Sequence, residues 1–422
     1  MPLNIPDTLK AQLEFTCAYE KDKLPLLNPE ADQLFKRARW IEKKNMLTQN
    51  ASENPTIERL YRIAYGWGHY KAGHNLAIML RQGKSLAKDL ISMPVEIAQN
   101  MIDQGIPMGY YDMGVLLNKG YGVQHDSKAA LQYIRKAADL GDPDAQYYVG
   151  DELSSFGITN PVPFKIGLEM LRCAGEQGHA KAAYDTGDYL RIFAHSKEPG
   201  GNFEEARRFY QLALKAGNRM AADKLYGAFN GLQPDNRSFY MPFPKDEERI
   251  RRYDMIEKLL DGYEYLNPTV EELDEIVPLP PAKLPPWDGT IKWVKEWESD
   301  IPPPLPSEER INEMAREKGL DPKTGWPLPK AEPQAAAPVE PDEPSRLPIG
   351  TQAASGQRCP QTGLWECGAP QAQVPRRFFQ TGQTLPPAVL PITRTLWQRL
   401  CGHPTVRLED STWTLVEHTP DA

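Results

Sequence analysis

The feature that most constrains this chain is a glycine that recurs at nearly equal intervals through its first half. The intervals are 36 to 39 residues, and the positions are Gly68, Gly105, Gly141, Gly178 and Gly217. A small residue follows four positions after each glycine, at Ala72, Gly109, Ala145, Ala182 and Ala221. A second small series lies five positions further on, at Ala77, Gly114, Gly150 and Gly187. Such a period is typical of a solenoid, in which each unit buries its apolar face only by stacking on its neighbour.

One period contains two predicted helices, and residues 105–144 show them best. Residues 109–118 form the first predicted helix, and a glycine-containing loop leads to a second helix that ends at Leu140. An aspartate precedes the second helix as its cap, and a glycine follows its last residue. These turn, cap and packing positions are Gly120, Gly122, Asp126, Ala137 and Gly141. The sequence therefore predicts helical hairpins whose small residues allow close packing.

The pattern in this unit, G-x-G-V-x-x-D-x-x-K-A followed by K-A-A-x-x-G, resembles the Sel1-like repeat, a relative of the tetratricopeptide repeat. The next two units fit less well. One has FGITNPVPFKIG in place of the glycine loop, and the other inserts RIFAHSKEPGG before its second helix. The resemblance implies a mainly α fold with a Sel1-like helical-hairpin solenoid over residues 68–230.

The segments before and after the repeats are predicted to form four further parts of the chain. Residues 1–67 read as an N-terminal helical cap, and residues 231–329 as a capping helix followed by a Pro- and Trp-rich segment. Residues 267–345 hold 17 of the 40 prolines, which favours extended polyproline II structure. Because Trp287, Trp293 and Trp297 are costly to leave in water, we expect this segment to wrap along the solenoid. Residues 330–352 read as a linker and 353–422 as a small β-rich domain of three to five strands.

Composition excludes several classes of function. The net charge of −8 and the dispersed basic residues argue against nucleic acid as a partner. No apolar run approaches the roughly 20 residues that span a bilayer. The N-terminal residues lack the pattern of a secretory signal, which predicts a cytoplasmic chain unless a leader has been removed, in which case it is periplasmic.

The cysteines and histidines do not predict a metal or cofactor site. There is no CxxC pair, and no two histidines have the i, i+4 spacing of helical metal ligands. Cys359 and Cys367 lie in one glycine-containing loop and could form a disulfide in an oxidising compartment. No hydrolase, protease or nucleotide-binding motif is present, so we expect a protein that is not an enzyme and needs no cofactor.

The predicted partner-binding residues lie on the first helix of each repeat, which lines the concave face of two-helix solenoids. They stand two or six positions after the first small residue, at His74, Tyr111, Tyr147, Tyr184, Asp151 and Asp188. Tyrosine is common at interfaces because its rigid ring carries one polar tip. The tyrosines could equally pack between repeats, and the two aspartates could be solvated. An unrecognised hydrolase would have only these two aspartates to use as a carboxylate pair.

A second resemblance concerns function. The segments LPPAKLPPWDG, PPPLPSEERI and GLDPKTGWPLP and the tail with CPQTG, RRFF, LWQ and TWTL resemble bacterial proteins encoded beside toxic effectors of the type VI secretion system. Those proteins are regarded as immunity proteins. The resemblance implies that this chain neutralises a cognate toxin, with a lipase or phospholipase as the suggested class, by binding and occluding it. The alternative is a scaffold or adaptor that organises an envelope or signalling complex.

Overall fold

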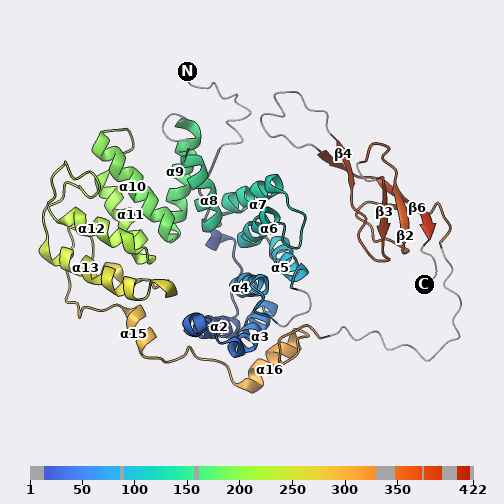
Figure 1. The fold of residues 1–422 in the computed structure, drawn as a ribbon, viewed down its shortest axis with the longest axis horizontal. Coiled ribbons are helices and arrows are strands. Elements are labelled where there is room, and N and C mark those ends of the chain that lie inside the picture. The colour runs from blue at the N-terminus through green and yellow to red at the C-terminus, as the bar shows by residue number, and fades with distance from the viewer. Residues whose placement is uncertain are drawn as a thin grey trace. The chain divides into compact units, whose positions relative to one another are not determined.

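The computed structural model describes residues 14–85, 90–155, 161–328, 347–372, 375–391 and 406–418. The chain separates into two compact units, Met1–Pro329 and Lys330–Ala422. The first unit is helical and the second contains the strands (Figure 1). The predicted fold class, a helical solenoid followed by a small β-rich domain, is confirmed.

The helices of the first unit follow one another in antiparallel pairs. The two that precede the repeats are α2 (Pro29–Thr48) and α3 (Asn54–Gly66). The repeats contain α4 (Tyr70–Arg81), α5 (Ser92–Asp103), α6 (Pro107–Lys119), α7 (Ser127–Leu140), α8 (Pro143–Ser154), α9 (Pro161–Glu176), α10 (Ala180–Ser196), α11 (Phe203–Lys215) and α12 (Arg219–Phe229). The later helices are α13 (Glu247–Gly262), α14 (Leu273–Ile276), α15 (Lys292–Glu298) and α16 (Glu308–Glu317). Short 3-10 helices are η1 (Glu20–Asp22), η2 (Ala51–Glu53) and η3 (Glu264–Leu266).

The two series of small residues serve two different helix contacts. A Cβ atom added to Gly109 on α6 would lie 2.6 Å from Met101 Cβ of the preceding helix, α5. A Cβ atom added to Gly114, also on α6, would lie 2.6 Å from Ile134 of the following helix, α7. The first series thus lets a repeat approach its predecessor, and the second lets the two helices of one repeat approach each other. Such close approach has no room for a larger side chain.

The predicted ends of the repeat helices are also confirmed. Asp126 accepts hydrogen bonds from the backbone N–H groups of Lys128 and Ala129, and so caps α7. Gly141 ends the helix with φ of 109°, and its N–H binds the Ala137 carbonyl. This left-handed conformation is costly for residues with a Cβ atom, which explains why glycine recurs here.

The Pro-rich segment closes the first unit into a ring, as Figure 1 shows by the return of α15 and α16 toward α2 and α3. At the solenoid end, the Arg249 guanidinium donates to the carbonyls of Pro278 and Ala282. At the other end, Arg310 on α16 pairs with Glu30 on α2 at 2.9 Å. The buried Ile311 and Met314 join the core formed by α2, α3 and α4. The expected wrapping of this segment is therefore present.

The second unit contains two antiparallel sheets. The strands are β1 (Gln352–Ala354), β2 (Gly363–Cys367), β3 (Arg376–Phe379), β4 (Ala388–Pro391), β5 (Val406–Glu409) and β6 (Thr412–His418). A four-stranded sheet has the order β1-β6-β2-β3, and β4 pairs with β5. Trp365 and Trp413 are buried in the core, where Trp413 packs edge-on against Phe379. The described part of this unit contains six strands, one more than the upper end of the predicted range of three to five. The reason is that β4 and β5 form a separate pair beside the four-stranded sheet.

The suggested disulfide between Cys359 and Cys367 is wrong. Both thiols are free and buried. The Cys359 thiol lies 3.1 Å from the Gln361 carbonyl oxygen, whereas Cys367 at the end of β2 faces the Ser411 hydroxyl at 3.3 Å. Each sulfur is therefore directed to its own local polar partner rather than to the other cysteine.

Candidate protein-binding site

The residues predicted to bind a partner come from successive first helices of the repeats. We call His74, Tyr111, Tyr147, Asp151, Tyr184 and Asp188 the first-helix face; they lie on α4, α6, α8 and α10. Neighbouring repeats contact one another along this face. The Tyr147 ring stacks on His179 of the next repeat with centroids 4.5 Å apart, whereas the Tyr184 ring lies 5.9 Å from Tyr210 of the same repeat.

His74 belongs to an acidic part of the first-helix face. Its Nδ1 atom lies 2.9 Å from Asp112 Oδ1 of the next repeat. Burial disfavours the charged imidazole, but the Asp112, Asp144 and Asp142 carboxylates outweigh it and raise the pKa of His74. His74 therefore pairs with Asp112, which the sequence analysis did not single out because one aspartate on a helix gives no local signal.

The three tyrosines are half-buried and combine packing with an accessible edge. Burial and the nearby Asp144 and Asp142 carboxylates raise the pKa of Tyr111 to about 12, so its phenol stays neutral and can donate a hydrogen bond. Tyr184 packs against the core formed by α10 to α13. Packing within the solenoid thus accounts for part of each ring, and display to a partner stays a prediction.

The two aspartates of the first-helix face have different surroundings. Asp151 is exposed, and within the described residues no ion pair or hydrogen bond reaches its carboxylate. Asp188 accepts hydrogen bonds from Tyr210 at 2.7 Å and from Arg191 at 3.0 Å, and the Lys224 ammonium lies 3.1 Å away. Asp188 is thus the centre of a packed network, whereas the exposed Asp151 carboxylate interacts electrostatically with Lys181 of the next repeat.

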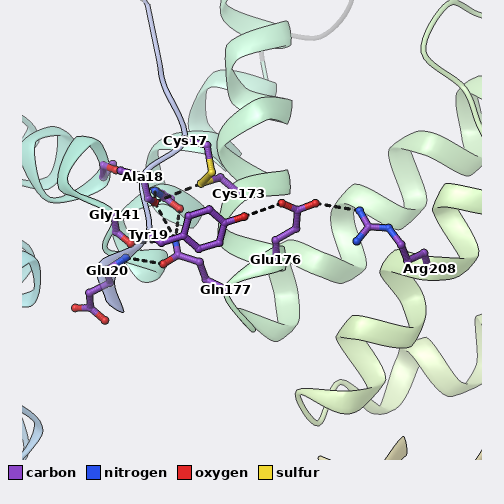
Figure 2. Close-up of a disulfide and its surroundings, with 11 residues drawn as sticks. Cys17, Ala18, Tyr19, Glu20, Gly141, Cys173, Glu176, Gln177 and Arg208 are labelled. Carbon is purple, nitrogen blue, oxygen red and sulfur yellow. Dashed lines mark hydrogen bonds and ion pairs between the residues drawn. A yellow bond between two sulfur atoms is a disulfide. The ribbon is translucent and has the colours of Figure 1, made fainter. Parts of the chain in front are cut away.

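An N-terminal segment, residues 14–23, lies against the repeats beside this face (Figures 1 and 2). Gln146 and Gln177 donate to the Ala18 carbonyl, and the Glu20 N–H donates to the Gln177 side chain at 2.8 Å. The Tyr19 hydroxyl binds Glu176 at 3.0 Å. This segment supplies backbone partners to polar side chains of α8 and α9, so it is an integral part of the repeat surface.

A disulfide fixes the N-terminal segment to α9. Cys17 and Cys173 are joined with their Cα atoms 5.7 Å apart, across a sequence separation of 156 residues (Figure 2). Sequence analysis missed this bond because two isolated cysteines so far apart give no signal of spatial proximity. Disulfides persist in oxidising compartments, so the bond is compatible with the periplasm.

Glu20 is the most perturbed carboxyl of the N-terminal segment. Its Oε1 atom is buried without a hydrogen-bond partner, as is Asp142 Oδ2 nearby. Burial raises the pKa of Glu20 to about 7, and Asp144 adds to the rise while Lys71 and His74 oppose it. The folded chain therefore holds a proton on Glu20 that the unfolded chain releases at lower pH.

This perturbation predicts a pH-dependent stability. The raised pKa means that Glu20 contributes almost no penalty below its usual value of 4.5, that the penalty grows as the pH rises from 4.5 to about 7, and that it is fully present above 7. We expect Glu20→Gln to stabilise the protein by about 1–2 kcal/mol near pH 8 and to have little effect near pH 4. Thermal denaturation at both pH values measures the change. Glu14→Gln, on an exposed side chain of the same segment, is the control; equal gains from Glu20→Gln at both pH values would contradict the assignment.

Two kinds of site were not found in the described part of the chain. No helix there combines the length and apolar character needed to cross a membrane. No group of three or more His, Cys, Asp or Glu side chains is arranged to hold a metal ion among those residues.

Known protein families match two adjacent parts of the chain. The Sel1 repeat matches residues 107–142, 143–179 and 180–218. A family described as "Domain of unknown function (DUF6396)" matches residues 221–328, which include α13 to α16 and the Pro-rich segment. No curated protein matches the chain.

Three solved structures from Pseudomonas aeruginosa are similar over nearly their full length. The protein PA5086 is 33% identical, with 63% of this chain and 95% of that chain covered and a TM-score of 0.47. The immunity protein Pa5087 is 30% identical, with 64% and 95% covered and a TM-score of 0.46. The immunity protein PA5088 is 30% identical, with 63% and 94% covered and a TM-score of 0.46. On the strength of this sequence identity, the chain, which carries Sel1 repeats, belongs to the same family as PA5086, Pa5087 and PA5088.

Proposed function

We propose that this chain is an immunity protein that binds a toxic effector of the type VI secretion system and blocks its active site. The observation that carries the proposal is the 30% identity to Pa5087 and PA5088, both called immunity proteins, over 94–95% of their length. Sel1-type solenoids offer extended surfaces for protein partners. The chain then acts by binding and not by catalysis, and a lipase or phospholipase is the class of effector we propose.

The first-helix face has the properties expected of the binding surface. Half-buried tyrosines provide rigid rings with polar tips. The exposed Asp151 carries a negative charge without a described ion-pair partner. This combination favours an effector surface with an aromatic or apolar centre and a basic residue opposite Asp151. The Cys17–Cys173 bond supports the periplasm as the compartment in which the two proteins meet.

A charge reversal tests the location of the binding surface. We expect Asp151→Lys to weaken binding to the cognate effector by about tenfold or more, because it replaces attraction by repulsion without breaking a described ion pair. Calorimetric titration with the effector encoded beside this chain measures the dissociation constant. The control is Glu152→Lys, which makes the same change at the adjacent exposed residue of α8.

Two outcomes would count against this placement. Equal weakening by both variants would indicate a general effect of net charge, and unchanged binding in both would place the interface away from α8. If the neighbouring effector does not bind the unaltered chain at all, the immunity function itself is wrong, and an adaptor that organises a complex becomes the better explanation.

A further inference from the structure

A groove of about 580 Å3 lies where the ring closes, between α2 and the segment that contains α15. It is separate from the first-helix face, whose residues lie on α4 to α10. On one wall α2 contributes Trp40 and Lys43, and on the other α15 contributes Trp293 and Trp297. Three consecutive prolines, residues 302–304, also line the groove. The groove exists only because the Pro-rich segment returns to the N-terminal helices.

The walls of the groove are held in place by contacts between their own rings and with residues beside the groove. Trp293 and Trp297 stack with centroids 5.7 Å apart, and Trp293 also packs against Tyr263. The Lys44 ammonium lies 4.0 Å above the Trp297 ring and pairs with Asp300 at 2.6 Å. These contacts fix the indole rings before any ligand arrives, which lowers the entropic cost of binding.

The wall contributed by α2 carries an uncompensated positive charge. Lys36, Arg39 and Lys43 line the groove, whereas Glu296 is the one carboxylate among the lining residues. Lys36 is paired with Asp32 and Arg39 with Glu42. Lys43 is half-buried, contacts the Trp293 ring, and has no carboxylate partner within the described residues. Burial lowers the pKa of Lys43, as expected of an ammonium that lacks an anion.

Apolar surface next to this charge remains open to solvent. Ile301, at the edge of the groove, is 74% exposed, and Leu47 is 72% exposed one turn beyond Lys43 on α2. Tryptophan and arginine beside exposed apolar residues are characteristic of surfaces that bind proteins. The tryptophan rings also suit the flat faces of proline and aromatic side chains.

From these contacts we infer that the groove binds an extended, acidic segment of a partner protein, with proline or aromatic residues between its carboxylates. A carboxylate of that segment pairs with Lys43, and the intervening rings pack on Trp40, Trp293 and Trp297. The inference goes beyond the proposed function, because it assigns a second protein-binding site, of which one wall is α2 and the other, α15, lies in the part of the chain matched by the domain of unknown function. Since both walls are needed, binding also stabilises the closed ring.

Two matched peptides test this site on the full chain. The first is the capped octapeptide Glu-Pro-Phe-Glu-Pro-Phe-Glu-Pro, and the second has lysine in place of each glutamate. We expect the acidic peptide to bind with a dissociation constant of about 10–100 μM and the basic peptide to bind about tenfold more weakly or not at all. Isothermal titration calorimetry at low ionic strength gives both constants.

Substitutions then locate the bound peptide. Lys43→Gln is expected to weaken binding of the acidic peptide about fivefold or more, whereas Lys136→Gln, at an exposed lysine on α7 without a described ion pair, leaves it unchanged. Thermal denaturation verifies that both variants remain folded. Equal binding of the two peptides, no binding of either, or equal effects of the two substitutions would each overturn the inference. Because these assays use no toxin, their failure leaves the proposed immunity function untouched.

Discussion

Replacing Cys17 by Ser will lower the free energy of unfolding of the first unit by about 3–5 kcal/mol, because the bond to Cys173 closes a very long loop in the unfolded chain. The bond spans 156 residues, and a loop of that size gives one of the larger entropic effects of a single disulfide. Cys17 itself is exposed, so the serine side chain adds no burial penalty. Denaturant unfolding of both proteins, followed by tryptophan fluorescence, measures the loss.

A reductant supplies the matched control for this prediction. It should lower the stability of the unaltered protein to that of Cys17→Ser and leave the variant unchanged. Limited proteolysis should then cut residues 14–23 in the variant and in the reduced protein, since non-covalent contacts such as the hydrogen bonds from Arg135, Gln146 and Gln177 then hold this segment without the covalent bond. A variant as stable as the unaltered protein under oxidising conditions would show that the bond does not constrain the unfolded chain.

Substituting Asp188 by Ala will cost a similar amount, about 3–5 kcal/mol, because it removes the anion from a network of partly buried cations. The Arg191 side chain is 5% exposed and the Lys224 side chain 12% exposed, and both lose their described carboxylate partner. The Tyr210 hydroxyl, in the core between α10 and α11, loses its acceptor as well. Thermal and denaturant unfolding measure the loss.

Asp151 provides the comparison, because it occupies the equivalent position of the preceding repeat. Asp151→Ala should change the free energy of unfolding by no more than about 0.5 kcal/mol, as is usual for an exposed residue without partners. Similar losses from the two substitutions would mean that the network around Asp188 does not contribute to stability. The contrast also separates the two roles: Asp188 supports the first-helix face, and Asp151 is displayed on it.

The repeat architecture could be predicted because its physical requirements fall on single residue types. A left-handed turn after each second helix selects glycine, as at Gly141, and close approach of helices selects glycine or alanine, as at Gly109. The two irregular units still form the pairs α8–α9 and α10–α11, since Gly150 and Gly187 retain their close contacts. Insertions between the helices do not disturb these requirements.

The candidate site was less predictable, because the residues that contact its side chains come from distant parts of the chain. The regular spacing placed Asp151 and Asp188 on one face, but could not show that Arg191, Tyr210 and Lys224 surround only Asp188. Likewise, no local sequence pattern relates Cys17 to Cys173, which form a disulfide. Cys359 and Cys367 lie close together in the sequence and suggested a disulfide, but both are free. Contacts between segments far apart in sequence depend on the path of the whole chain.

The most direct test of the proposed immunity function is bacterial growth when the proposed cognate effector is directed to the periplasm. We predict that the effector alone stops growth, that the chain directed to the same compartment restores it, and that Asp151→Lys restores it less well than Glu152→Lys. Growth that stays arrested although both folded proteins are present in the periplasm would contradict the account.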